Sequence, residues 1–345
     1  MRCAADAAGK EDRMNLVTGA TGLLGSHIAE RLVQAGQPVR ALVRAGSDTS
    51  FLDSLRVEKI VANLANPSTL AAACQGVEVV YHAAARVGDW GPWSEFQRDT
   101  IEATKNMAEA AQKAGVRRFL HISSISAYGH PNGKNLVLDE TAPLGTNLHR
   151  WSYYSIAKVE AEKLLWQMHR QQGLGLTVIR PSWIYGPRDR TSIARLHRMF
   201  TTGRIKILGS GNNRLNTVYA GNVADACLLA AQKEAAIGQA YNCSNDGEIT
   251  QKEYMDKFAA AFGCRPPARK VPYWLAYSVG FDCECIGRLL RLKKPPFVTR
   301  YSVWLMGRDV FFSTEKARRQ LGWQSRIGYD EGIPLTAEWY LKRLT

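Results

Sequence analysis

Residues 15–32 read NLVTGATGLLGSHIAERL, and this stretch decides how the rest of the chain is interpreted. The apolar pair Leu16-Val17 is typical of the end of a buried strand. Ile28 and Leu32 recur at the spacing of one helix face. The stretch therefore predicts a strand, a tight glycine turn and a helix, in that order.

Three glycines, Gly19, Gly22 and Gly25, lie between the strand and the helix. Glycine lets the backbone turn sharply and approach a ligand without a Cβ in the way. The free N–H groups and the positive dipole end of the new helix favour an anion. The spacing differs from the commoner Gly-x-Gly-x-x-Gly, and an ordinary glycine turn is the alternative interpretation. We interpret the turn as the pyrophosphate site of a dinucleotide, formed by Gly19, Thr21, Gly22, Leu23 and Leu24.

Buried strands and amphipathic helices alternate after this turn, with strands expected at 39–43, 57–64, 77–82, 117–124 and 176–181. This alternation predicts an α/β fold, a doubly wound parallel Rossmann sheet with a smaller C-terminal substrate-binding subdomain. We assign the dinucleotide-binding domain to residues 13–185 plus 217–243. The substrate-binding subdomain is assigned to 186–216 plus 244–340, and residues 1–12 to a flexible tail.

Local signals fix smaller features of this plan. Ser68 is expected to cap a short helix that ends near Ala73, and Thr250 to cap a helix over 251–263. The small residues Ala83, Ala84 and Ala85 follow the fourth strand and leave room for a ligand at its carboxyl end.

The second strand ends at Val43-Arg44, and no carboxylate follows until Asp48. In NAD-binding Rossmann folds an acidic residue near this position accepts hydrogen bonds from the adenine ribose. A guanidinium can instead hold a 2′-phosphate bidentately. Arg44, with Ser47 nearby, therefore favours NADP(H), and NAD(H) is the alternative. Arg44 can also be interpreted as a surface arginine without a role in binding.

Tyr154 and Lys158 are spaced i, i+4 on one expected helix, so both can reach a single site. A nearby ammonium favours tyrosinate, so we expect Lys158 to lower the pKa of Tyr154. Such a phenol can pass a proton to or from a substrate oxygen. Ser124, just past the fifth strand, can hydrogen-bond the same oxygen. Tyr153 lacks a basic partner, because its fourth neighbour is Ala157.

The chain resembles the extended short-chain dehydrogenase/reductases, the NAD-dependent epimerase/dehydratase superfamily, from about residue 14 to 339. The matching motifs are TGATGLLG at 18–25, SSISAYG at 123–129, YSIAK at 154–158, RPSWIYGP at 180–187 and NTVYAGNVADA at 216–226. The resemblance implies that Ser124 is the catalytic serine and that Pro181, Trp183 and Ile184 lie against the nicotinamide. The chain departs from the family pattern at Thr100, where an asparagine is usual.

Within the superfamily the chain is nearest to the 3β-hydroxysteroid dehydrogenase and dihydroflavonol reductase-like branch. This resemblance implies an NAD(P)-dependent oxidoreductase that interconverts a secondary alcohol and a ketone on an apolar, sterol-, isoprenoid- or flavonoid-like substrate. The alternatives are a nucleotide-sugar epimerase, dehydratase or reductase, and a non-catalytic dinucleotide-binding regulator. The residues expected to contact substrate are Trp90, Trp93, Ser126, Tyr185 and Arg188; Arg188 is also open to interpretation as part of a solvated face.

Composition limits the other function classes. The net charge is +14, but the basic residues are spread along the chain, so we expect a small-molecule substrate and no nucleic acid. The seven cysteines and seven histidines form no metal-ligand spacing, so we expect free thiols, no metal and a cytoplasmic protein.

Residues 271–294 are apolar and aromatic with interspersed charges, which makes a spanning helix a poor interpretation. Three interpretations of this segment stay open: a lid over the substrate, a peripheral membrane contact, and packing against the main domain. The family resemblance implies a homodimer formed by two helices from each subunit, including 152–170.

Overall fold

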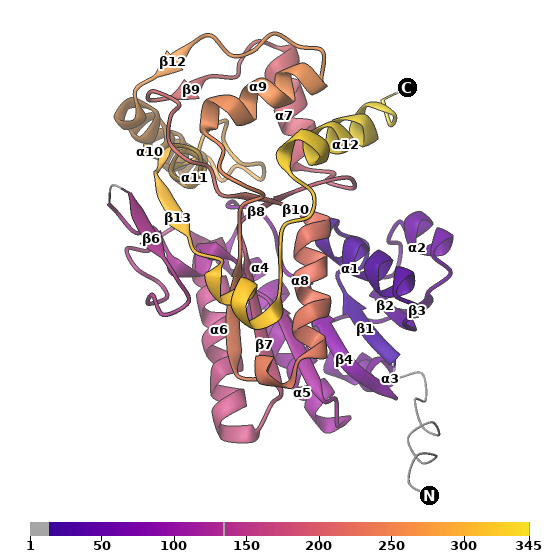
Figure 1. Cartoon of the computed structure of the whole chain (residues 1–345). Coiled ribbons are helices and arrows are strands. Elements are labelled where there is room, and N and C mark those ends of the chain that lie inside the picture. The colour runs from indigo at the N-terminus through magenta and orange to yellow at the C-terminus, as the bar shows by residue number, and fades with distance from the viewer. Residues whose placement is uncertain (1–13, 134, 345) are drawn as a thin grey trace, which may run out of the picture.

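The structure, a computed structural model, describes residues 14–133 and 135–344. The tail expected at residues 1–12 lies outside the described residues. At the centre is one sheet of seven parallel strands in the order β11-β7-β5-β4-β1-β2-β3 (Figure 1). The strands are β1 (Met14–Thr18), β2 (Val39–Val43), β3 (Glu58–Val61), β4 (Val77–His82), β5 (Arg118–Ile122), β7 (Leu176–Pro181) and β11 (Gln239–Cys243).

The strand order reverses at β1, which pairs with both β2 and β4. In a parallel sheet, ligands bind where the order reverses, outside the carboxyl ends of the strands. This confirms the doubly wound α/β fold expected from the sequence. It also places the glycine turn after β1 at the reversal point.

Helices cover both faces of the sheet (Figure 1). On one face lie α1 (Leu23–Gln34), α2 (Ser50–Ser54) and α8 (Ala220–Gln232). On the other lie α3 (Ala71–Cys74), α5 (Ala103–Lys113) and α6 (Tyr153–Gln172). Each layer inserts a buried apolar stripe into the core, with Ile28 from α1 and Leu165 from α6 fully inaccessible to solvent. Full burial of such a side chain contributes about 2 kcal/mol.

The helix after β4, over residues 93–113, is continuous but contains a wider turn. It starts as α4 (Trp93–Phe96), passes through a π-helical segment at Gln97–Glu102 and continues as α5. Thr100 lies in the π-helical segment, and its hydroxyl accepts a hydrogen bond of 3.1 Å from the Arg86 N–H. The residue that departs from the family pattern therefore holds the loop after β4.

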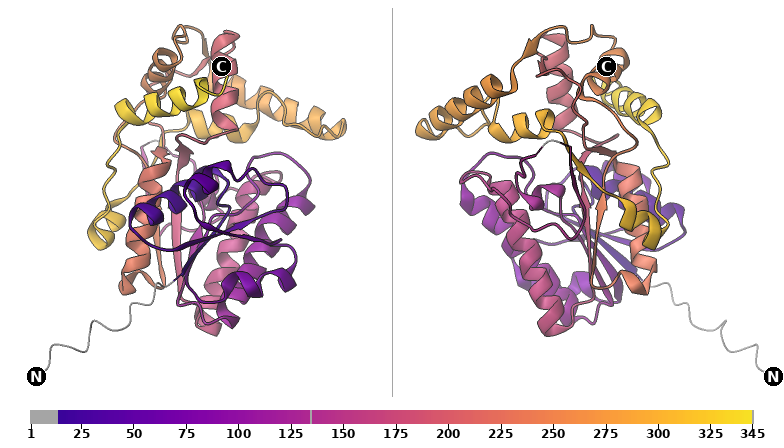
Figure 2. Two further views of the ribbon diagram at one scale, coloured as in Figure 1. Left: turned by 90° about the vertical axis from the view of Figure 1, so that its right-hand side faces the viewer. Right: turned by 60° about the vertical axis from the view of Figure 1, so that its left-hand side comes forward.

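A smaller group of helices lies above the carboxyl edge of the sheet (Figures 1 and 2). It contains α7 (Ser192–Thr201), α9 (Gln251–Ala261), α10 (Tyr273–Leu289), α11 (Arg300–Gly307) and α12 (Tyr329–Leu341). Three two-stranded parallel pairs accompany them: β8 (Trp183–Tyr185) with β10 (Thr217–Tyr219), β9 (Ile207–Leu208) with β12 (Lys270–Val271), and β6 (Leu136–Leu138) with β13 (Val310–Phe312).

Two of the local expectations meet different outcomes. Thr250 caps α9 as expected, and it forms a reciprocal capping box with Glu253. The expected Ser68 cap is wrong. Asn66 is the capping residue: it accepts from the Ser68 N–H and starts a short 3-10 turn at Pro67–Thr69, ahead of α3. The side-chain oxygen of Asn66 accepts from this N–H because Asn66 precedes the turn, whereas Ser68 is already part of the turn.

A buried ion pair joins α6 to the sheet. Glu162 is fully inaccessible to solvent and accepts hydrogen bonds from Arg180 Nε (3.1 Å), Ser123 Oγ (2.6 Å) and Trp166 Nε1 (3.0 Å). Arg180 in turn donates to Tyr128 Oη at 2.8 Å. Since each charge is matched by a partner, the pair can exist away from water.

We expect Glu162→Ala to lower the free energy of unfolding by about 3–5 kcal/mol, because it leaves the Arg180 charge buried and unmatched. Glu160→Ala on the same helix is the control. Glu160 is exposed and pairs with Lys163 at 3.2 Å, so its loss should change stability by less than about 1 kcal/mol. Urea denaturation measures both, and equal midpoints for the two variants would contradict this role of Glu162.

Candidate active site

The glycine turn fits a phosphate group. Gly19 has φ +68°, and a Cβ there would lie 2.8 Å from the Ala84 N–H nitrogen. A Cβ on Gly25 would lie 2.2 Å from the Gly19 carbonyl oxygen. Only glycine therefore allows β1, α1 and the Ala83–Ala85 run to approach so closely. Gly22 is exposed at the N-cap of α1, where the free N–H groups of the helix can meet an anion.

The other expected cofactor residues lie next to the turn in the chain, or at the ends of β2 and β7 and on β8. Thr21 and Leu23 are half-buried and Leu24 is buried on α1. Arg44 is exposed immediately after β2. Pro181 ends β7, and Trp183 and Ile184 are half-buried on β8.

Ser124 and Lys158 are brought to the carboxyl end of β5. Lys158, on the second turn of α6, donates from Nζ to the Ile122 carbonyl oxygen at 2.8 Å. Ser124 follows β5 directly, and its Oγ accepts from the Ser126 N–H at 3.1 Å. Burial lowers the pKa of Lys158 to about 8, although the Glu162 charge opposes this shift.

Tyr154 does not have the lowered pKa that the sequence predicts. Burial of the phenol raises its pKa, and only a hydrogen bond with Ser124 works in the opposite direction. The ammonium group of Lys158 donates to the Ile122 carbonyl at 2.8 Å. In this structure Tyr154 is therefore a protonated phenol at neutral pH.

Four hydroxyl groups form a hydrogen-bonded chain, which we call the hydroxyl chain: Tyr154, Ser124, Ser126 and Tyr301. The Ser124 Oγ donates to the Ser126 Oγ at 3.1 Å, and the latter lies 2.6 Å from the Tyr301 Oη. The rings of Tyr154 and Tyr301 meet edge to face at 6.3 Å between centroids. Burial raises the pKa of Tyr301, so this end of the chain is also protonated.

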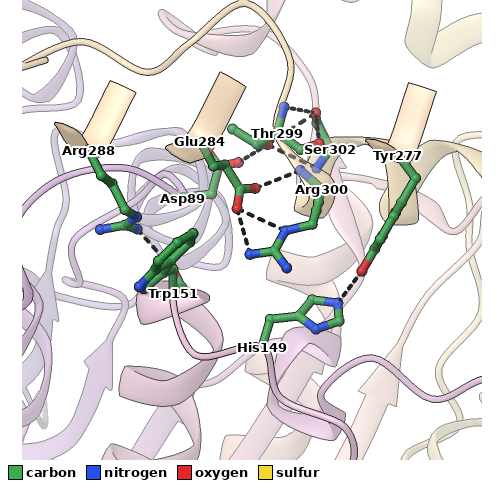
Figure 3. A network of polar contacts seen from close by, with 9 residues as sticks. All are labelled: Asp89, His149, Trp151, Tyr277, Glu284, Arg288, Thr299, Arg300 and Ser302. Atoms are coloured by element: carbon green, nitrogen blue, oxygen red, sulfur yellow. Dashed lines mark hydrogen bonds and ion pairs between the residues drawn. The ribbon is translucent and has the colours of Figure 1, made fainter. Parts of the chain in front are cut away.

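Tyr301 is the site residue that the sequence does not reveal. It lies on α11, 175 positions from its partner Ser126, within no recognised motif. Two contacts hold this part of the chain in place. Arg300 forms a bidentate ion pair with Glu284 of α10, and the Thr299 hydroxyl bonds Asp89 in the loop after β4 (Figure 3).

The aromatic residues expected around substrate form a cluster beside α10. Trp90 is buried and donates from Nε1 to the Leu292 carbonyl oxygen at 2.8 Å. Trp93 packs against Tyr153, with ring centroids 5.5 Å apart. The Arg288 guanidinium lies 4.9 Å from the ring centroids of Trp90, Trp151 and Tyr153.

Tyr185 and Arg188 are not brought to the hydroxyl chain by any contact that the structure describes. Tyr185 is buried in the core of the upper helices, and its hydroxyl donates to Asp246 at 2.9 Å. Arg188 pairs with Glu30 at 2.6 Å and donates to Ser26 at 2.9 Å, both on α1. Tyr185 thus connects β8 to Asp246, and Arg188 connects the segment after β8 to α1.

Two imidazoles lie beneath the site, inside the sheet. His82 and His121 are buried with ring centroids 5.8 Å apart. His82 hydrogen-bonds Thr18 at 2.9 Å and Thr104 at 3.1 Å. Burial, with the nearby Lys158 charge, lowers the pKa of His82 to about 3 and that of His121 well below its usual value. Both rings are neutral at physiological pH.

Known proteins are similar to this chain over most of its length. The chain is 30% identical over 325 residues to a 2-alkyl-3-oxoalkanoate reductase of Stenotrophomonas maltophilia, covering 92% of this chain and 96% of the relative. It is also 30% identical over 339 residues to a 3-beta-hydroxysteroid dehydrogenase of Mycolicibacterium neoaurum, covering 94% and 90%. The crystal structure of gox2253 superposes with a TM-score of 0.80 at 30% identity, covering 96% of this chain and 98% of that one.

The family resemblance described from the motifs is confirmed on the same residues. Residues 15–244 match the NAD dependent epimerase/dehydratase family, a span that includes the glycine turn, Ser124, Tyr154 and Lys158. The chain belongs to this family and is an NAD(P)-dependent oxidoreductase of the extended short-chain dehydrogenase/reductase type.

Proposed function

We propose that the protein reduces a ketone on an apolar substrate to a secondary alcohol, using NADP(H). The observation that carries this proposal is the hydroxyl chain, which ends in two protonated phenols, Tyr154 and Tyr301. It lies beside the cluster of Trp90, Trp93 and Tyr153.

Tyr154 is the proton donor in this proposal. A reduced ketone becomes an alkoxide and needs a proton, which a protonated phenol within hydrogen-bond reach can supply. Ser124 hydrogen-bonds Tyr154 and would bind the same substrate oxygen. The nicotinamide supplies the hydride. Lys158, whose ammonium already bonds the carbonyl at the end of β5, would bind the nicotinamide ribose.

The substrate class follows from the aromatic surroundings and from the relatives. Both relatives act, by name, at oxygen-bearing carbons of alkyl or steroid compounds. The cluster beside α10 supplies large apolar side chains for such a skeleton. A nucleotide sugar would need a cationic clamp for its diphosphate, and three of the four arginines between residues 188 and 198 are engaged elsewhere. Arg188 pairs with Glu30, Arg190 with Asp48, and Arg195 with the Phe297 carbonyl.

The cofactor preference rests on the turn after β2. Arg44 is exposed there, and Ser47 donates from its N–H to the Arg44 carbonyl at 3.1 Å, which closes the turn. The first carboxylate after Arg44 along the chain, Asp48, is matched by Arg190 at 2.9 Å. A 2′-phosphate would therefore meet a guanidinium without an opposing free carboxylate.

The division of labour within the chain is part of the same proposal. Residues 13–185 plus 217–243 would bind the dinucleotide, and 186–216 plus 244–340 the substrate. A homodimer through α6 is proposed on the family resemblance, and the outward row of polar residues on this helix, including Lys163 and Gln167, is accessible to a second copy.

Replacing Tyr154 with phenylalanine tests the chemistry. We expect Tyr154→Phe to lower kcat by about 10²–10⁴ with long-chain 3-oxoalkanoic acids and 3-oxosteroids, because the proton donor is lost. The affinity for NADPH should change little. Tyr153→Phe, one position earlier, is the control and should keep most of its activity. Undiminished turnover of Tyr154→Phe would exclude Tyr154 as the proton donor.

Replacing Tyr301 tests whether the far end of the hydroxyl chain contributes. We expect Tyr301→Phe to lower kcat/KM by about tenfold, the effect of one lost hydrogen bond, while thermal stability is retained because the ring remains. The matched control is Tyr273→Phe on α10, whose hydroxyl accepts from Arg308 Nε at 3.0 Å, outside the chain. Equal rates for the two variants would remove Tyr301 from the site.

The cofactor preference is tested by fluorescence titration of wild type and Arg44→Ala with NADPH and NADH. We expect the variant to bind NADPH about 10- to 100-fold more weakly, because one charge-assisted interaction is lost. NADH lacks the 2′-phosphate and provides the internal control, so its affinity should stay the same. Tight NADH binding in the wild type, with no effect of Arg44 on either cofactor, would overturn the preference for NADP(H).

A further inference from the structure

Helix α10 has two contrasting faces. One is directed toward the body of the protein and is held there by polar contacts of Tyr277, Glu284 and Arg288 (Figure 3). The Tyr277 hydroxyl lies 2.9 Å from His149 Nε2, Glu284 pairs with Arg300, and Arg288 lies against Trp151. These contacts fix the rotation of α10 about its axis, so the opposite face is held outward.

The outward face is apolar and exposed. Along α10, Trp274 is 68% exposed, Ile286 56% and Leu289 82%. Figure 2 shows α10 reaching beyond the edge of the helices beneath it. Further exposed apolar side chains extend the surface along α10 and into the segment that follows: Leu275, Val279, Leu290, Leu292 and Phe297. We call these eight residues the α10 surface.

Positive charge borders the α10 surface. Residues 285–308 contain six Lys and Arg and no Asp or Glu. Of these, Arg291, Lys293 and Lys294 are exposed immediately after the end of α10. Asp282 is the one exposed acidic residue on the helix itself. An apolar face bordered by cations is the pattern of a helix that lies in a membrane interface.

We propose that the α10 surface docks the protein onto an anionic lipid bilayer, with its apolar side chains at the boundary between headgroups and acyl chains. Arg291, Lys293 and Lys294 would meet the lipid phosphates. Asp282 limits the depth of insertion, since a carboxylate is costly in the hydrocarbon region. Among the described residues no helix has the length and apolar character to cross a membrane, so the contact is peripheral.

Charge distinguishes this occupant from a second copy of the chain. A two-fold interface places the same patch on both subunits. A two-fold axis near the C-terminal end of α10 would bring the three cations of each copy toward those of the other, with Asp282 as the one exposed acidic residue of the helix to offset them. An anionic bilayer supplies the opposite charge together with an apolar phase. The surface therefore fits a lipid interface better than it fits itself.

Docking on a bilayer would also bring an apolar substrate to the site. This point rests on the proposed function. Leu292 presents its side chain outward, while its carbonyl oxygen accepts from Trp90 in the aromatic cluster. An apolar substrate dissolved in the bilayer would thus reach the cluster along α10 with little exposure to water. Binding to vesicles needs no turnover, so its outcome is independent of whether the ketone-reductase proposal holds.

The test is co-sedimentation of the full chain with phosphatidylcholine vesicles, with and without phosphatidylglycerol. We expect binding to the anionic vesicles that weakens as salt is raised, and at least tenfold weaker binding to phosphatidylcholine alone. A double charge reversal, Lys293→Glu with Lys294→Glu, and an apolar-to-polar pair, Ile286→Ser with Leu289→Ser, should each weaken binding at least tenfold.

The matched control for charge is Lys105→Glu with Lys113→Glu on α5, which changes the net charge by the same amount and should leave binding intact. Circular dichroism checks the fold of every variant. The proposal is overturned if the chain sediments with neither vesicle, binds both equally, or loses binding as much in the α5 control. It is equally overturned if sedimentation velocity without lipid shows a dimer that the Ile286→Ser, Leu289→Ser variant abolishes.

Discussion

The buried pair of Glu162 and Arg180 is the interaction on which the site depends. Glu162 lies on α6 one turn beyond Lys158, and Arg180 lies on β7, so the pair fixes this helix against the sheet. Ser123 donates to the same carboxylate, which ties the end of β5 to α6 as well. The buried carboxylate of Glu162 therefore helps to set the positions of Ser124, Tyr154 and Lys158 relative to one another. A buried pair of this kind adds little net stability compared with apolar packing, but either partner alone is strongly unfavourable.

The substrate side of the site is assembled differently, from segments far apart in the chain. The Glu284–Arg300 pair joins α10 to α11, and the Asp89–Thr299 hydrogen bond joins both to the loop after β4. Together they hold Tyr301 where its hydroxyl meets Ser126. The cofactor side is thus a property of the sheet edge, whereas the substrate side depends on helices laid over it. This separation explains how relatives with a common dinucleotide site can differ in what they accept.

Local sequence predicted the features whose causes are local. The glycine turn, the Tyr154–Lys158 spacing and the Thr250 cap each depend on residues within one turn or one helix. Tyr301 could not be predicted, because its role arises from a contact across 175 residues. The pKa of Tyr154 was predicted in the wrong direction, because the spacing of Tyr154 and Lys158 along a helix does not show how deeply the phenol is buried.

The neutral imidazoles inside the sheet carry a consequence for acid tolerance. An unfolded chain would protonate His82 and His121 near pH 6.5, whereas the folded chain binds no proton on His82 until about pH 3. Below pH 6.5 the unfolded state thus binds more protons, so stability rises with pH across this window and levels off above it. For His82, each pH unit of acidification between about 6.5 and 3 removes about 1.4 kcal/mol of stability. The sheet that positions the cofactor is therefore most stable at neutral pH. Mild acid lowers its free energy of unfolding through the buried imidazoles.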